Sequence, residues 1–139
     1  MIDFGLSKRF TCPKSGNHIK YKKVFGVMGT PRYCSKNAHS EMEQSRRDDL
    51  ESIGNLLIYF SKGGWLPWIS SEIDMSEVQN AENILSVIRE EYTPELLCTG
   101  LPSCFLKYWQ YVRNLAFAEE PDYGYLKGLF EMEFINKGY

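Results

Sequence analysis

Residues 43–60, which read EQSRRDDLESIGNLLIYF, decide the fold of this chain. Apolar residues recur within the stretch at helical spacing, which predicts a helix with one broad apolar face that other parts of the protein must cover. The residues of that face are Leu50, Ile53, Leu56, Leu57 and Phe60. We therefore expect one central helix around which the remaining elements pack.

Both ends of this helix carry recognisable signals. Ser45 can cap the start, and Asp48 and Asp49 then lie in the first turn, where the positive end of the helix dipole favours carboxylates. Gly63 and Gly64 provide a stop signal just beyond Phe60. The sequence thus predicts a helix with good ends as well as an apolar body.

Length and composition indicate one globular, intracellular domain. The chain has 139 residues, which is enough for one domain with a real core. No apolar run is long enough to cross a bilayer, and the first residues lack the pattern of a signal peptide. We therefore expect no membrane partner and a location in the cytoplasm or the nucleus.

The cysteines and histidines do not follow the spacing of zinc or redox motifs, so we expect reduced structural thiols rather than a metal site. These residues are Cys12, Cys34, Cys98, Cys104, His18 and His39.

Charge is distributed unevenly along the chain. Residues 1–36 hold eight Lys or Arg against one acid, Asp3, whereas the remainder holds eight against seventeen. This basic first quarter is either a solvated loop or a surface that meets phosphates or acidic peptide. No recognised nucleic-acid motif accompanies it, so we expect no nucleic-acid partner.

The first 31 residues contain a short apolar start and then a long loop. Residues 1–5 read Met-Ile-Asp-Phe-Gly, which indicates the end of a strand followed by a turn. Residues 6–31 are rich in Lys, Gly, Ser and Thr and have no sustained helical period. A loop of this length in a compact domain is usually functional.

The second half predicts further helices. Ser76 could cap a helix whose apolar stripe is Ala81, Ile84, Leu85 and Ile88. Thr93-Pro94-Glu95 predicts a short helix through Cys98, because proline is favoured at the first helical position. Pro102 should open another helix and Asp122 the last one. Their expected apolar faces are Phe105, Trp109, Val112 and Ala116, and then Leu126, Leu129 and Phe130.

Several of these motifs resemble signatures of the casein kinase 1 family of serine/threonine protein kinases. EQSRRDDLESIG is similar to the opening of the central helix of that family's lower lobe. Asp3-Phe4-Gly5 resembles the magnesium motif of kinases, and residues 29–33, Gly-Thr-Pro-Arg-Tyr, follow it at the required distance and resemble the family's Gly-Thr-Ala-Arg-Tyr. Ser35-Lys36-Asn37 resembles its Ser-Ile-Asn, and residues 66–68 its Leu-Pro-Trp turn.

This resemblance implies part of a protein kinase-like α+β fold: a mainly helical C-terminal lobe with a long activation-segment loop, without the N-lobe. Residues 1–37 would contain the magnesium motif, the activation segment and the substrate loop, and residues 38–139 the helical lobe. In the family, the glycine-rich loop and the catalytic loop lie upstream of Asp-Phe-Gly. We therefore expect this chain to be a segment of a longer kinase, inactive alone, in which some apolar side chains of the central helix face water.

The resemblance also implies roles for individual residues. Asp3 would ligate Mg²⁺ on the phosphates of ATP, Phe4 would pack beneath it, and Gly5 would let the loop turn. Thr30 would help to hold the catalytic aspartate and lysine, and Asp49 would anchor the backbone of the catalytic loop. Substrate binding would fall to Gly29, Arg32 and Tyr33.

The match departs from the family at several positions. Pro31 replaces alanine, and Ala116 and Glu120 stand where the family usually has basic residues. Arg32 would contribute to a pocket for phosphate or acidic side chains, yet residues 63–88 contain no Lys or Arg to complete it. We therefore do not assume the family's usual preference for primed or acidic substrates.

The activity implied is transfer of the terminal phosphate of ATP to Ser or Thr hydroxyls of protein substrates, with Mg²⁺ as cofactor. Two other interpretations remain open. One is a non-catalytic kinase-lobe remnant that binds proteins through Arg32 and the basic residues 8–23. The other is an unrelated all-helical interaction domain.

Overall fold

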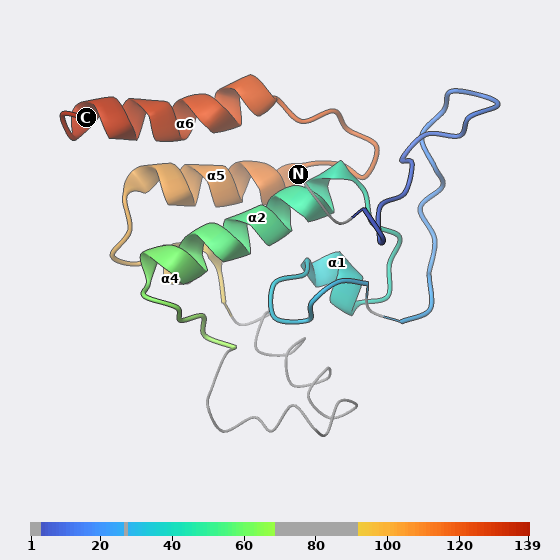
Figure 1. Ribbon diagram of the computed structural model, residues 1–139, viewed down its shortest axis with the longest axis horizontal. Helices are drawn as coiled ribbons and strands as arrows, with labels where there is room; N and C mark the ends of the chain where they lie inside the picture. Colours follow the sequence, from blue (N-terminus) through green and yellow to red (C-terminus); the bar gives the residue numbers. More distant parts are fainter. Residues whose placement is uncertain (1–3, 27, 69–91) are drawn as a thin grey trace.

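The structure, a computed structural model, describes residues 4–26, 28–68 and 92–139. Within these ranges the chain is mainly helical, as Figure 1 shows. The helices are α1 (Lys36–His39), α2 (Arg46–Ser61), α4 (Pro94–Leu97), α5 (Ser103–Asn114) and α6 (Tyr123–Asn136). The mainly helical character of the predicted lobe is therefore confirmed, whereas the helix expected after Ser76 lies outside the described residues.

Helix α2 has the ends that its sequence predicts. Ser45 is the N-cap residue, and Asp48 and Asp49 lie in the first turn. At the other end, Gly63 and Gly64 have φ angles of 67° and 90°, which glycine adopts without the steric cost of a side chain. The N–H of Gly64 donates to the carbonyl oxygen of Tyr59 (2.8 Å), which closes the helix.

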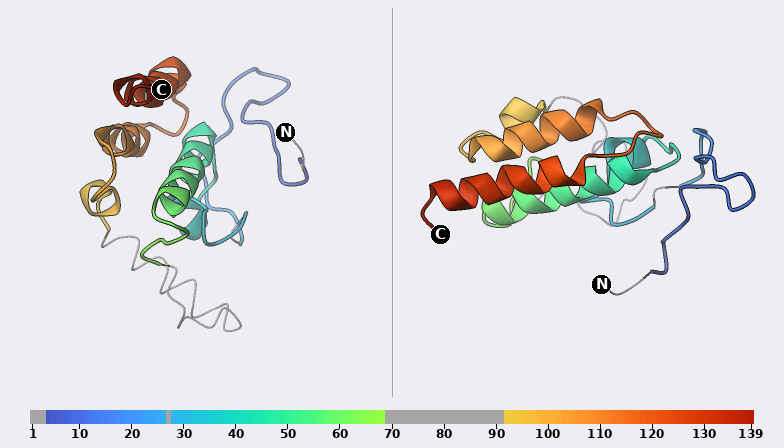
Figure 2. Two further views of the ribbon diagram at one scale, coloured as in Figure 1. Left: turned by 60° about the vertical axis from the view of Figure 1, so that its left-hand side comes forward. Right: turned by 90° about the horizontal axis from the view of Figure 1, so that it is seen from above.

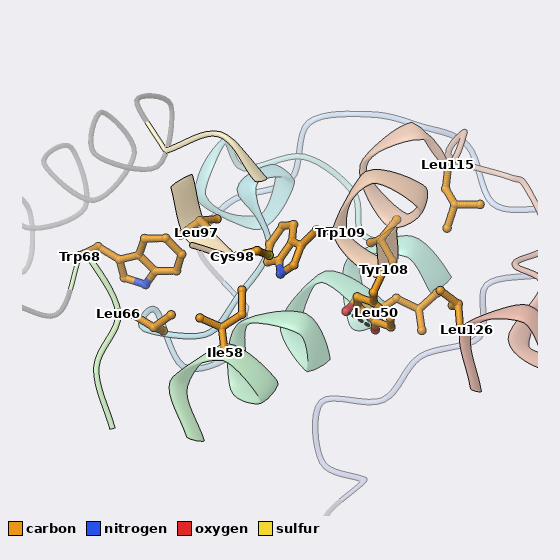
Figure 3. Close-up of a cluster of buried hydrophobic side chains, with 11 residues drawn as sticks. Leu50, Ile58, Leu66, Trp68, Leu97, Cys98, Tyr108, Trp109, Leu115 and Leu126 are labelled. Atoms are coloured by element: carbon orange, nitrogen blue, oxygen red, sulfur yellow. Dashed lines mark hydrogen bonds between the residues drawn. The ribbon is translucent and has the colours of Figure 1, made fainter. Parts of the chain in front are cut away.

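The longer helices form a stack in which α5 lies between α2 and α6 (Figures 1 and 2), and α4 packs against α5. The core lies along α5, where Trp109 is 2% exposed and Tyr108 donates its hydroxyl to the carbonyl oxygen of Leu50 (2.8 Å; Figure 3). Gly54 allows this close approach, because a Cβ there would lie 3.0 Å from Cε1 of Tyr108. The core cluster is Leu50, Ile58, Leu66, Trp68, Leu97, Cys98, Tyr108, Trp109, Val112, Leu115 and Leu126.

The predicted buried face of α2 is only partly correct. Leu50 is buried, but Ile53 is 46% exposed and Phe60 is 71% exposed. The helix instead buries Asp48, Leu50, Glu51, Gly54, Asn55 and Ile58. Half of these are polar, because Asp48, Glu51 and Asn55 turn towards the loop, whose polar groups need hydrogen-bond partners. Exposure of Ile53 and Phe60 does agree with the expectation that part of the apolar face meets water.

The later helices follow their sequence signals closely. Thr93 caps α4 with proline at its first position, and Asp122 caps α6 by accepting from the N–H of Tyr125 (2.8 Å). The prediction for Ala116 was wrong, because α5 ends at Asn114 and Ala116 is exposed. Leu115 is buried in its place, since the extended backbone beyond the helix turns that side chain towards the core.

Residues 6–26 and 28–31 form the long loop that the sequence predicts, and the irregular chain continues to Ser35 before α1. They contain only isolated bridges, Thr11 with His18 and Lys23 with Met42, among the described residues. The loop runs beside the N-terminal end of α2 and returns to it through α1 (Figure 1). This path places residues 29–37 against α2.

Candidate functional site

A cavity of about 680 Å³ lies between the long loop and the first half of α2. Its lining includes Gly29, Thr30 and Tyr33 from the loop and Asp49 from the helix. Pockets of this size are typical of small-molecule and cofactor sites. One cavity is therefore shared by four of the residues that the sequence analysis identified as candidate site residues. These four lie up to twenty positions apart in the chain.

The loop is attached to α2 through a buried carboxylate. Asp48 has no exposed surface and accepts from Ser35 Oγ (2.7 Å), Asn37 Nδ2 (2.9 Å) and the backbone N–H of Ser45 (2.8 Å). The bond from Ser45 is the Asp48 half of a capping box. One side chain thus stabilises the start of α2 and holds the Ser-x-Asn segment.

Two further polar side chains extend this attachment along the helix. Glu51 accepts from the backbone N–H of Lys36 (2.9 Å), and its carboxylate lies 3.8 Å from Arg113 Nη1. Asn55 donates from Nδ2 to the carbonyl oxygen of Tyr33 (3.0 Å). Because Asp48, Glu51 and Asn55 recur at helical spacing, they hold the end of the loop over two turns of α2.

The earlier part of the loop is fixed by stacking on arginines of α2. The guanidinium of Arg46 lies 4.5 Å from the ring centroid of Phe10, and that of Arg47 lies 5.8 Å from the ring of Tyr21. Arg47 also donates to the carbonyl oxygen of Leu115 (3.0 Å). These arginines therefore connect the long loop, α2 and the turn after α5.

Charged groups of both signs line the cavity. Lys8 forms an ion pair with Glu43, whose side chain is almost completely buried. Asp49 is exposed at the edge of the cavity, where partial desolvation raises its pKa above the ordinary value and the Asp48 carboxylate adds to the effect. Because water reaches Asp49, it limits the size of this shift.

The remaining predicted site residues are placed differently. Asp3, the expected magnesium ligand, lies outside the described residues. Phe4 is 63% exposed, and neither Phe4 nor Gly5 lines the cavity. Arg32 does not line it either; its backbone carbonyl accepts from Trp68 Nε1 (2.8 Å). The structure thus groups Gly29, Thr30, Tyr33 and Asp49 and leaves Arg32 beside them.

The described residues show neither a metal centre nor a membrane-spanning helix. They contain no group of three or more His, Cys, Asp or Glu side chains arranged to hold a metal ion. Of the two carboxylates at the cavity, Glu43 is paired with Lys8, so these two groups do not by themselves form a magnesium site. No helix in the described ranges is long and apolar enough to cross a membrane.

Sequence reasoning missed the part that Asp48 and Asn55 play, because it assigned buried positions of α2 to apolar residues. The signal was present: Asp48, Glu51 and Asn55 recur at intervals of three and four residues, which places them on one face of the helix. Cys34, which lines the cavity, was likewise considered only as a structural thiol.

No protein-family model matches this chain.

Proposed function

We propose that this chain is the helical lobe of a casein kinase 1-like serine/threonine kinase, which transfers the terminal phosphate of ATP to protein hydroxyls. The observation that supports the proposal most is the attachment of residues 33–37 to α2 through Asp48, Glu51 and Asn55. The two segments that resemble the family most closely are thus bonded to each other and line one cavity. Such contact is what a substrate loop mounted on a catalytic helix requires.

Phosphoryl transfer depends mainly on positioning and on charge neutralisation, and little covalent chemistry falls to the protein. In the proposed enzyme, Asp49 accepts hydrogen bonds from the backbone of the catalytic loop at the cavity edge. Thr30, which lines the same cavity, positions the catalytic side chains. Asp48 is a positioning residue, because it holds the loop that carries Thr30.

Substrate would lie along the segment formed by Gly29, Arg32 and Tyr33. Tyr33 is held by an edge-to-face contact with Tyr59 (5.5 Å between centroids) and by its carbonyl bond to Asn55. Arg32 is held through its carbonyl bond to Trp68. A loop fixed by its backbone can present its side chains to a substrate without a large ordering cost. Asp3 would hold Mg²⁺, which would supply charge neutralisation on the nucleotide.

One experiment tests this proposal directly. The N-lobe and catalytic loop of a casein kinase 1 enzyme are fused upstream of this chain, and phosphate transfer from ATP to casein is measured with Mg²⁺. We expect activity in the fusion protein, its loss in Asp3→Asn, and retention in Glu131→Gln, an exposed change on α6. A folded fusion protein without activity, or full activity in Asp3→Asn, would contradict the kinase proposal.

A second function, binding of acidic proteins without catalysis, is favoured by the basic part of the loop. Residues 8–23 contain no acid, and Arg9, Lys14 and Lys20 are exposed while Phe10 and Tyr21 hold the segment on α2. This role predicts that the chain itself binds a poly-glutamate peptide and that Lys14→Ser with Lys20→Ser weakens binding. If the fusion protein is inactive and the peptide binds, the binding role replaces the kinase.

A further inference from the structure

Cys34 lies in an environment that differs from that of the other thiols. Its Sγ is 3.2 Å from Nε2 of His39, and its S–H donates to the carbonyl oxygen of Pro31 (3.4 Å). The same His39 nitrogen lies 2.9 Å from that carbonyl oxygen. Because a carbonyl oxygen can only accept, Nε2 carries the hydrogen. Its N–H can therefore also donate to the sulfur.

This N–H favours the deprotonated form of Cys34. A thiolate accepts hydrogen bonds far better than a thiol, so a donor 3.2 Å away stabilises the reactive form, and protonation of the imidazole would increase the effect. Cys34 as a whole residue is 5% exposed, and it is one of the residues that line the 680 Å³ cavity. A small molecule in the cavity could therefore reach it.

The other cysteines serve as internal references. Burial raises the pKa of Cys98 to about 11, and it also raises the pKa of Cys104. Thiols of this kind are inert towards electrophiles in the native protein. Cys12 is half-buried at the surface, and a hydrogen bond from Ser15 lowers its pKa, so Cys12 is a second accessible thiol that an experiment must remove.

We propose that Cys34 is a covalent modification site for small α,β-unsaturated carbonyl compounds that enter the cavity, with His39 as the positioning residue. The thiol gives its proton to water, and the thiolate attacks the β-carbon of the ligand. A sulfur–carbon bond forms while the electron pair of the C=C bond moves to the carbonyl as an enolate. Water then returns a proton to the α-carbon, so the net reaction is an addition that needs no oxidant.

The adduct would act on the loop that forms the cavity wall. The backbone N–H of Cys34 donates to the carbonyl oxygen of Thr30 (3.1 Å), and the Cys34 carbonyl lies 3.4 Å from Nδ2 of Asn55. A bulky group on Sγ would displace these contacts and with them Gly29 and Thr30. This modification site does not depend on the proposed kinase activity, since it follows from the thiol, the imidazole and the cavity alone.

The test uses the full chain carrying Cys12→Ser, treated with N-ethylmaleimide at pH 7, with modification of each cysteine followed by peptide mass spectrometry. We expect Cys34 to react at least tenfold faster than Cys98. His39→Gln should slow Cys34 about tenfold, whereas the matched change His18→Gln should leave its rate unchanged. Equal rates at Cys34 and Cys98, or no effect of His39→Gln in a folded protein, would overturn the proposal.

If His39→Gln does not fold, Cys98 will be labelled faster in that variant. A second measurement then still tests whether His39 stabilises the Cys34 thiolate. The rate at Cys34 in the chain with an intact His39 is measured from pH 5 to 10. We expect its midpoint to lie below about 8.5, the value of a free thiol. A midpoint at or above that value would show that His39 does not stabilise the thiolate, and the proposal would be wrong.

Discussion

Replacement of Asp48 by alanine should destabilise the protein more than any other single change at a polar residue of α2. The substitution removes the acceptor of three hydrogen bonds, those from Ser35, Asn37 and the backbone of Ser45. The first two donors are side-chain groups that hold the loop end, and the third closes the start of the helix. Asp48 therefore acts on both segments at once.

The size of the effect can be worked from these bonds. Loss of the helix cap costs about 1 kcal/mol. Each side-chain donor left without an acceptor beside the buried helix costs a further 1 kcal/mol or so, at the lower end of the usual range. We therefore expect Asp48→Ala to lower the free energy of unfolding by about 3 kcal/mol. Asp48→Asn should cost less, because its amide oxygen still accepts from Ser35 and Asn37 while its NH₂ faces the N–H of Ser45.

Urea unfolding followed by tryptophan fluorescence is a suitable assay, because Trp109 and Trp68 are buried in the core. The matched control is Asp49→Asn on the next residue, which is exposed and should change stability by no more than about 0.5 kcal/mol. Its effect should also depend on pH. The folded protein raises the pKa of Asp49, so ionisation of this carboxyl group opposes folding. Any gain in stability from Asp49→Asn should therefore be absent at low pH and appear as pH rises through that pKa.

Equal shifts of the urea midpoint in Asp48→Ala and Asp49→Asn would refute a special role for the buried carboxylate. A neutral Asp48→Ala would refute it as well, since the buried network would then contribute nothing to folding. An Asp48→Asn variant that is less stable than Asp48→Ala would show that the donor facing Ser45, and not the lost acceptors, dominates the cost.

Further predictions concern the helix interface, a buried thiol and the exposed apolar side chains. Gly54→Ala should lower the free energy of unfolding by about 1 kcal/mol in urea, although alanine has the better helix propensity, because a Cβ would lie 3.0–3.2 Å from the aromatic rings of α5. The control Gly128→Ala, which has open space around it, should raise the free energy of unfolding by about 0.5 kcal/mol. A gain at both sites would refute the close packing at Gly54. Burial raises the pKa of Cys98 to about 11 in the folded protein, so the neutral thiol favours folding. The free energy of unfolding should therefore fall as pH rises from the ordinary thiol pKa towards 11, and Cys98→Ala should flatten that decline. Ile53→Lys combined with Phe60→Ser should reduce self-association in light scattering while leaving the urea midpoint nearly unchanged, since both side chains are largely exposed; a large loss of stability would mean that they are packed.

The sequence by itself determined where α2, α4, α5 and α6 begin and where α2 ends. Ser45, Thr93 and Asp122 occupy the N-cap positions of α2, α4 and α6, and the side chains of Thr93 and Asp122 accept from backbone N–H groups there. These signals act within one helical turn, because a polar or carboxylate side chain at the start of a helix satisfies backbone N–H groups a few residues away. Glycine at Gly63 ends α2 for an equally local reason, its positive φ angle.

Only the tertiary structure decided which side of α2 is buried and what the long loop does. Hydrophobicity favoured Ile53 and Phe60, whereas the helix turns Asp48 and Asn55 inward to meet the loop. The physical reason is that a buried polar side chain is stable only when its hydrogen-bond partner is present. The partners of Asp48 and Asn55 come from residues 33–37, which contact α2 only in the folded protein. The cavity between them is a property of that contact, so no local pattern in the sequence could have predicted its shape.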